Sequence, residues 1–163
     1  MAFSLSRRAR RAKEESRLAA LLEAQPVVTK KVREAIAPIV DPLLESGSAT
    51  LDVQIGEWAT EFHLRPKNSG AARLDLDASR DQIAVLVGDI GSRKEIWQGC
   101  TTEGLEELVA CVTAVVEGKY VERVYGRGSR HLMTFGEPPC PQYKRFGGRG
   151  RYGPSRTTRY EPY

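Results

Sequence analysis

Apolar residues change their spacing along this chain, and the change predicts an α+β fold. Before residue 45 they recur at helical intervals, and from Thr50 onward they alternate with polar residues, as in strands with one buried face. A second helical pattern follows the alternating region. We therefore expect two N-terminal helices, then an antiparallel sheet with one amphipathic helix packed on its face, and a disordered basic C-terminal tail.

The two N-terminal helices are separated by proline. Residues 5–25 are rich in Ala, Leu, Arg, Lys and Glu, which favour helix, and Pro26 is expected to end this first helix. The second is expected to begin at Thr29 as its N-cap. Pro38 and Pro42 interrupt its apolar pattern and predict a kink or a split.

A shift of one residue marks the start of the predicted sheet. Leu51, Val53 and Ile55 occupy alternate positions, whereas the apolar residues from 58 to 64 follow the opposite parity, with Gly56 at the shift. We expect a β-bulge within one long bent strand. The alternative is a tight turn between two short strands.

Five further strands complete the expected sheet. The unbroken apolar run within residues 82–88 predicts a central strand covered on both faces. The other four strands are each bounded by turn-forming residues and are expected at residues 73–77, 94–98, 120–125 and 131–135.

The strongest helical pattern covers residues 103–117. Thr101 or Thr102 can cap its N-terminus, and Gly118 with Lys119 can close its C-terminus. We expect Val109, Val112 and Val116 to pack on the strand formed by residues 83–87, with Cys111 as a small core residue. The predicted apolar face consists of Leu105, Leu108, Val109, Val112, Val115 and Val116.

Composition changes sharply after Phe135. Residues 136–163 contain no aliphatic side chain and are rich in Pro, Gly, Arg and Tyr, so we expect a tail that is disordered in isolation. This divides the chain into a basic N-terminal helix (1–28), a compact α+β domain (29–136) and a Pro/Gly/Arg/Tyr-rich tail (137–163).

Charge follows the same division. Residues 1–17 carry six basic and two acidic residues, residues 140–163 carry six basic and one acidic residue, and residues 18–139 carry 13 basic and 18 acidic residues. The two ends should attract polyanions, and the acidic body should repel them.

The tail also interleaves Arg with aromatic rings on a Gly-rich backbone, a chemistry that suits single-stranded nucleic acid. In this respect it resembles the Arg-Gly-rich segments of RNA-binding proteins. The nucleic-acid-binding residues expected first are Lys144, Arg145, Phe146, Arg149, Arg151 and Tyr152. Those expected second are Arg7, Arg8, Arg10 and Arg11.

Other polar clusters have simpler interpretations. The turn at residues 126–129, followed by Arg130, could hold an anion, but an ordinary hairpin turn explains it better. His63 and His131 lack the spacing of a metal site, and His63 should point to solvent. Asp75 and Asp77 fit a charged outer sheet face better than a cation site.

These observations predict a non-enzymatic binding protein that attaches to a nucleic acid or nucleoprotein assembly through its basic termini. The alternative is a protein-binding adaptor, an immunity-type inhibitor or a virion structural protein whose tails wrap neighbouring subunits. No cofactor, metal or membrane partner is expected. Three cysteines without CxxC spacing favour reduced thiols and a cytoplasmic location.

Overall fold

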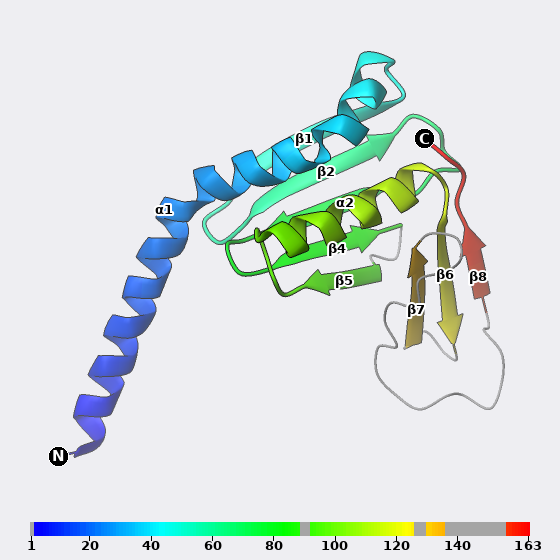
Figure 1. Cartoon of the computed structure of the whole chain (residues 1–163). Coiled ribbons are helices and arrows are strands. Elements are labelled where there is room, and N and C mark those ends of the chain that lie inside the picture. Colours follow the sequence, from blue (N-terminus) through cyan, green and yellow to red (C-terminus); the bar gives the residue numbers. More distant parts are fainter. Residues whose placement is uncertain (1, 89–91, 126–129, 136–155) are drawn as a thin grey trace.

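The described residues form two helices and two antiparallel sheets (Figure 1). It is seen in a computed structural model that describes residues 2–88, 92–125, 130–135 and 156–163. Its elements, in chain order, are α1 (Ala2–Glu45), β1 (Ala49–Ile55), β2 (Thr60–Pro66), β3 (Leu74–Ala78), β4 (Ile83–Val87), β5 (Ser92–Ile96), α2 (Thr102–Val116), β6 (Tyr120–Tyr125), β7 (Arg130–Phe135) and β8 (Arg156–Arg159).

The main sheet is a five-stranded antiparallel meander with strand order β1-β2-β3-β4-β5. Both helices lie on the same face of it, α1 over β1 to β3 and α2 over β4 and β5 (Figure 1). This confirms the predicted α+β class. Alternate residues of each strand point into the layer between sheet and helices, and the most deeply buried are Phe62, Leu64, Leu74, Leu76, Ile83, Val85, Val87 and Ile96.

The expected bulge at Gly56 is wrong, and the alternative of two short strands is right. β1 and β2 pair in a regular register from Ala49↔Pro66 to Ile55↔Thr60, and the Gly56 N–H donates to the Ala59 carbonyl at 2.9 Å. A four-residue connection therefore separates the strands. The opposite parities seen in the sequence are simply the two strands of one hairpin, each turning its apolar side toward α1.

The apolar run of residues 83–87 forms β4, an interior strand of the sheet, as predicted. It lies between β3 and the edge strand β5. Ile83, Val85 and Val87 face the helices and are fully buried, whereas Ala84 and Leu86 lie on the opposite face, which neither helix covers. The expected cover on both faces is thus only partly seen: Ala84 is buried, whereas Leu86 is half-buried.

The N-terminal region forms one helix instead of the expected two. α1 continues through Pro26, Pro38 and Pro42, and Thr29 lies inside it, where its hydroxyl donates to the Gln25 carbonyl at 2.8 Å instead of capping a new helix. All three prolines are exposed, so the carbonyls that lose a partner face water. The opposite side of this part of the helix carries a fully buried stripe of Val28, Val32, Ile36 and Val40.

The N-terminal part of α1 turns away from the sheet, whereas its C-terminal part lies across it (Figure 1). Bends of this kind in helices typically occur at proline. The buried stripe begins at Val28, two residues after Pro26. Packing of this stripe therefore stabilises the helix after Pro26.

α2 is the predicted amphipathic helix, with Thr101 as its N-cap: the Thr101 hydroxyl accepts a hydrogen bond from the Gly104 N–H. Gly118, with a φ of +70°, follows its C-terminus, as expected. Val112 and Cys111 are buried as predicted. Val109 and Val116 are only half-buried, because the helix is rotated so that Leu108, Val112 and Val115 lie deepest.

The second sheet has the order β7-β6-β8. The predicted strands at residues 120–125 and 131–135 are β6 and β7, which pair antiparallel, and the turn expected at residues 126–129 lies outside the described residues. β8 was not predicted. It pairs antiparallel with β6, so the final eight residues of the expected disordered tail form part of the fold, whereas residues 137–155 lie outside the described residues.

Of the helices in the described part of the chain, none has the length and apolar character needed to cross a membrane.

Candidate nucleic-acid interface

The residues predicted first for nucleic-acid binding lie outside the described part of the chain. All six, from Lys144 to Tyr152, belong to residues 136–155. The four arginines predicted second, Arg7, Arg8, Arg10 and Arg11, lie on the N-terminal part of α1, which extends away from the sheet (Figure 1). The two groups are therefore at opposite ends of the chain, and their side chains are not among those described.

The structure does define what lies on either side of residues 136–155. β7 precedes this segment, β8 follows it, and both pair with β6. The sequence suggested a tail with one free end. In the fold, this segment is instead a connection between two strands of one small sheet.

Basic residues continue into the strands at the end of this connection. Arg159 pairs with Val121, and Thr157 pairs with Arg123. Directly paired residues, and residues two apart on a strand, share a face, so Arg123 and Arg159 lie on the same side of the sheet. Arg159 is exposed and Arg123 is half-buried.

The residues after β8 form a strap, defined here as Tyr160, Glu161, Pro162 and Tyr163. The Glu161 N–H donates to the Gly70 carbonyl at 2.9 Å, and the Tyr163 N–H donates to the Val116 carbonyl at 3.0 Å. The Asn68 amide nitrogen donates to the Glu161 carboxylate at 3.1 Å and to the Pro162 carbonyl at 3.0 Å. The strap thus fixes β8 to the main sheet and to the end of α2.

Aromatic packing supports the strap as well. The rings of Tyr160 and Tyr120 lie 5.6 Å apart, and Tyr120 is fully buried. Gly88 has a φ of +75°, and a side chain there would collide with the Tyr160 hydroxyl. A glycine at this position therefore serves both the turn after β4 and the close approach of the strap.

Carboxylates collect on the uncovered face of the main sheet, well separated in sequence from the basic ends. His63 lies there, as predicted, with its Nδ1 atom 2.8 Å from Asp75 and its Nε2 atom 3.3 Å from Glu61. Arg65 also pairs with Asp75, at 2.5 Å. The charged residues on this face are Asp52, Glu61, Asp75, Asp77, Glu95, Arg65 and Arg93.

The two aspartates of β3 differ in their ionisation. Burial alone would raise the pKa of Asp75, but hydrogen bonds from Arg65 and His63 outweigh it and hold the pKa below its ordinary value. Burial and the neighbouring Glu61 carboxylate raise the pKa of Asp77. The predicted charged outer face is therefore present, and it has an ionic network at one end and carboxylate repulsion at the other.

A buried lysine lies on the covered face of the same sheet. The Lys94 side chain is fully buried, with its Nζ atom 2.6 Å from Glu107 and 3.3 Å from the Cys111 sulfur, both on α2. Sequence analysis overlooked this ion pair. The alternation along the strand could have revealed it, because Lys94 and Ile96 are two residues apart and therefore point to the same, buried side of the sheet. The ion pair joins α2 to β5 within the core.

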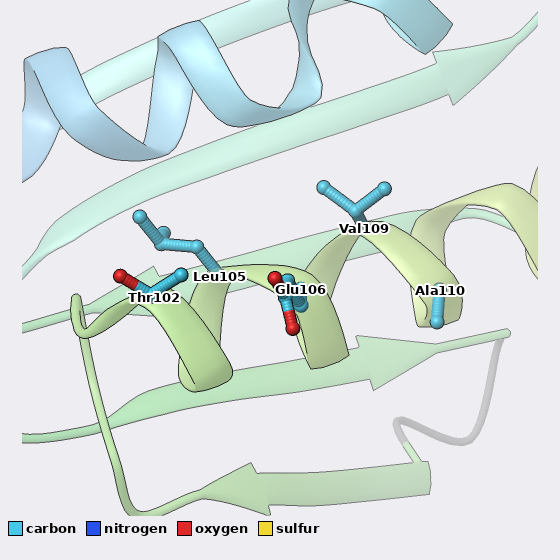
Figure 2. Close-up of a pocket in the computed structure, with 5 residues that line it drawn as sticks. All are labelled: Thr102, Leu105, Glu106, Val109 and Ala110. Carbon is cyan, nitrogen blue, oxygen red and sulfur yellow. The ribbon is translucent and has the colours of Figure 1, made fainter.

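A shallow open groove of about 420 Å³ runs along α2 (Figure 2). Leu105 and Val109 point from α2 toward α1, and Thr102, Glu106 and Ala110 complete the lining that the described residues provide. None of the described groups with a shifted pKa, namely Asp75, Asp77, Cys100 and Tyr163, lines this groove. It therefore has the character of a helix surface more than of a catalytic pocket.

Comparison with known proteins gave no relative: no family model, no curated protein and no solved structure matches this chain. Within the described ranges, no group of three or more His, Cys, Asp and Glu side chains is placed to hold a metal ion. Inference about function therefore depends on charge distribution, fold and the chemistry of the basic segment.

Proposed function

We propose that this protein is a non-enzymatic binding protein that attaches to single-stranded nucleic acid, free or within a nucleoprotein assembly, through residues 143–152. The proposal is supported by one observation above all. The Arg- and Tyr-rich segment is joined at both ends to strands of the β7-β6-β8 sheet, and Arg123 and Arg159 share a face of that sheet. The segment and this basic face can therefore act as one binding surface.

The chemistry of the segment suits this ligand. Its Lys and Arg side chains would neutralise phosphates, and Phe146 and Tyr152 would stack on unpaired bases, each stacked base contributing about 1–3 kcal/mol. Stacking requires bases that are not enclosed in a duplex, which favours a single strand. Arginines at the start of α1 would bind further phosphates at a distance from this surface.

The acidic face of the main sheet supports the same arrangement. Five carboxylates there are accompanied by only two arginines and one histidine. A polyanion would be repelled from this face, so binding should be confined to the basic elements. The contrast between the two sheets leaves the β7-β6-β8 sheet, with its basic connection, as the sheet suited to phosphate.

The test is the salt dependence of binding to mixed-sequence single-stranded RNA and DNA. In the key variant, Lys144, Arg145, Arg149 and Arg151 are all replaced by Gln, which leaves β8 and the strap intact. Counterion release predicts that log K falls with log[salt], and that the slope decreases by about 0.7 for each phosphate that the variant no longer neutralises. The matched control replaces Lys30, Lys31, Lys67 and Arg80, which are all exposed, by Gln. It changes net charge equally and should keep the parent slope.

A second variant separates stacking from charge. Replacing Phe146 and Tyr152 by Ala should weaken binding by at least tenfold without changing the salt slope, because every basic side chain is retained. The proposal is overturned if the full chain shows no binding at low salt, or if the control and key variants change the slope equally. Either result would favour a protein partner.

A further inference from the structure

The outer strand of the main sheet has an open edge. Hydrogen bonds at both ends of the β1–β2 hairpin fix which backbone groups face β2: the Gly56 N–H and the Ser48 carbonyl both bond toward β2, at 2.9 and 2.8 Å. Because these groups alternate along a strand, the N–H and C=O groups of Leu51, Val53 and Ile55 point away from β2. No other strand in the described part of the chain pairs with that side.

This edge lacks the features that usually prevent pairing between sheets. β1 has seven residues in unbroken register with β2, contains neither Pro nor Lys, and has a single charged residue, Asp52. The opposite edge, β5, has five residues and carries Arg93, Lys94 and Glu95 in succession. Of the two edges of the main sheet, the β1 edge is therefore the one suited to accept another strand.

Exposed apolar side chains gather at the same corner. Among the described residues, the large exposed hydrophobics are Val27, Val53, Ile55, Trp58 and Trp97, with exposed fractions of 56%, 38%, 64%, 59% and 66%. All but Trp97 belong to β1, to the β1–β2 turn or to the adjacent turn of α1. That turn of α1 lies against Thr60, the partner of Ile55, because the Thr60 hydroxyl donates to the Gln25 side-chain oxygen and shares a hydrogen bond with the Thr29 hydroxyl. Apolar surface concentrated in this way typically marks an interaction site.

We propose that β1 pairs with β1 of a second copy of this chain, antiparallel and about a two-fold axis through Val53, to form a homodimer with one continuous sheet. In this register Val53 faces Val53 of the second copy, Leu51 faces Ile55, and Asp52 faces Gln54. Apolar residues thus meet apolar residues, and a carboxylate meets an amide that can donate to it. The outward backbone groups of Leu51, Val53 and Ile55 all find partners.

Neighbouring registers are much less favourable. An axis through Asp52 would place two carboxylates opposite each other, and an axis through Gln54 would place Leu51 opposite Glu57. A strand that complements itself in the register about Val53 meets the self-complementarity that a two-fold symmetric interface requires. The second copy is therefore a better occupant of this edge than an unrelated strand.

The mass of the full chain tests this proposal, measured by sedimentation equilibrium in high salt after nuclease treatment, so that nucleic acid cannot bridge two copies. The expected mass is twice 18.1 kDa. Val53→Lys would place two ammonium groups at the axis and should weaken dimerisation by at least tenfold. Trp97→Lys also replaces an exposed hydrophobic residue, but away from β1, and should leave the dimer intact.

Cross-linking tests the register. Val53→Cys should give a covalent dimer under mild oxidation, because the two copies of residue 53 lie opposite each other. Gln54→Cys and the parent chain, treated identically, should not. A monomeric parent at all concentrations overturns the proposal, as does a dimer that Val53→Lys leaves unchanged and Val53→Cys fails to cross-link. If Val53→Lys shows no melting transition by circular dichroism, the variant does not fold, and the cross-linking result then decides whether the dimer exists.

Discussion

The Tyr163 hydroxyl donates a hydrogen bond to the carbonyl oxygen of Ala72, a residue 91 positions earlier in the chain. Ala72 lies just before β3, the central strand of the main sheet. The strap therefore contacts the chain at the start of the central strand, and residues that composition alone assigned to a disordered tail contribute to the stability of the sheet.

Replacing Tyr163 should destabilise the fold in two distinguishable steps. Tyr163→Phe removes the hydrogen bond alone and should cost about 0.5–1.5 kcal/mol. Tyr163→Ala also removes the ring and should cost about 2–3 kcal/mol, somewhat less than a fully buried aromatic residue. Urea denaturation measures both values. Equal effects of the two variants would contradict a packed ring.

Tyr163 should also make stability fall at alkaline pH. Burial raises the pKa of this phenol above its ordinary value near 10. The folded state therefore holds the proton more tightly than the unfolded state, so the free energy of unfolding falls as pH rises above about 10. Tyr163→Phe should show a shallower fall than the parent. Identical alkaline profiles would show that this phenol is already exposed.

The two aspartates of β3 should respond oppositely to replacement by Asn. Asp75→Asn removes a carboxylate that pairs with Arg65 and His63, and should lower stability at pH 7 by about 0.5–1 kcal/mol. Asp77→Asn relieves a carboxylate disfavoured by burial and by Glu61, and should raise stability by a smaller amount.

Both differences should disappear as pH falls below about 4, for opposite reasons. Because the pKa of Asp75 is lowered in the folded state, its carboxylate stabilises the fold at pH values above its ordinary pKa, and this stabilisation is lost in acid. Because the pKa of Asp77 is raised, its carboxylate destabilises the fold at neutral pH, and this penalty is relieved in acid. Unfolding free energies measured from pH 3 to pH 7 check the signs. Two variants that shift in the same direction would contradict the described network.

The buried ion pair should be sensitive to loss of either partner alone. Glu107→Gln leaves the Lys94 ammonium buried without its carboxylate and should cost about 3 kcal/mol. Lys94→Met with Glu107→Leu replaces the pair by apolar side chains of similar length and should be nearly neutral. A double-mutant cycle of Lys94→Met, Glu107→Leu and the variant with both changes, measured by chemical denaturation, gives the coupling. If the free-energy changes of the two single variants simply add, the two side chains do not interact, and Lys94 is exposed to water instead of buried.

Val112 should be essential to the core. Val112→Asp buries a carboxylate between α2 and the main sheet and should cost several kcal/mol, enough to unfold a domain of ordinary stability. Ala110→Asp lies on the exposed side of the same helix and should change stability by about 0.5 kcal/mol or less. Similar thermal melting of both variants would show that the wrong face of α2 is assigned to the core.

Periodicity predicted most of the main sheet and α2, because each of these elements buries one face and the sequence records which one. It could not decide between a bulge and a turn at Gly56, since both shift the apolar parity by one residue. It also misjudged Pro26, since the burial of Val28 and Val32 that keeps α1 continuous is a tertiary effect. Propensity alone does not contain such information.

The candidate interface was less accessible to sequence reasoning. The composition of residues 140–163 taken as a whole does not reveal that two tyrosines and two adjacent threonines near the end of the chain belong to the strap and β8. Lys94 could be placed inward by parity, but its partner Glu107 depends on how α2 crosses the sheet. The nucleic-acid-binding residues themselves remain predictions from composition and charge.

α1 gives this protein unusual hydrodynamics for its mass. At a rise of about 1.5 Å per residue, its 44 residues extend for about 66 Å, and the part before Pro26 projects from the sheet (Figure 1). A projecting rod increases friction far more than it increases mass. Even a monomer should therefore elute early from a gel-filtration column, at the position of a larger compact protein. Elution volume alone would count it as a dimer, whereas light scattering and sedimentation equilibrium report mass independently of shape.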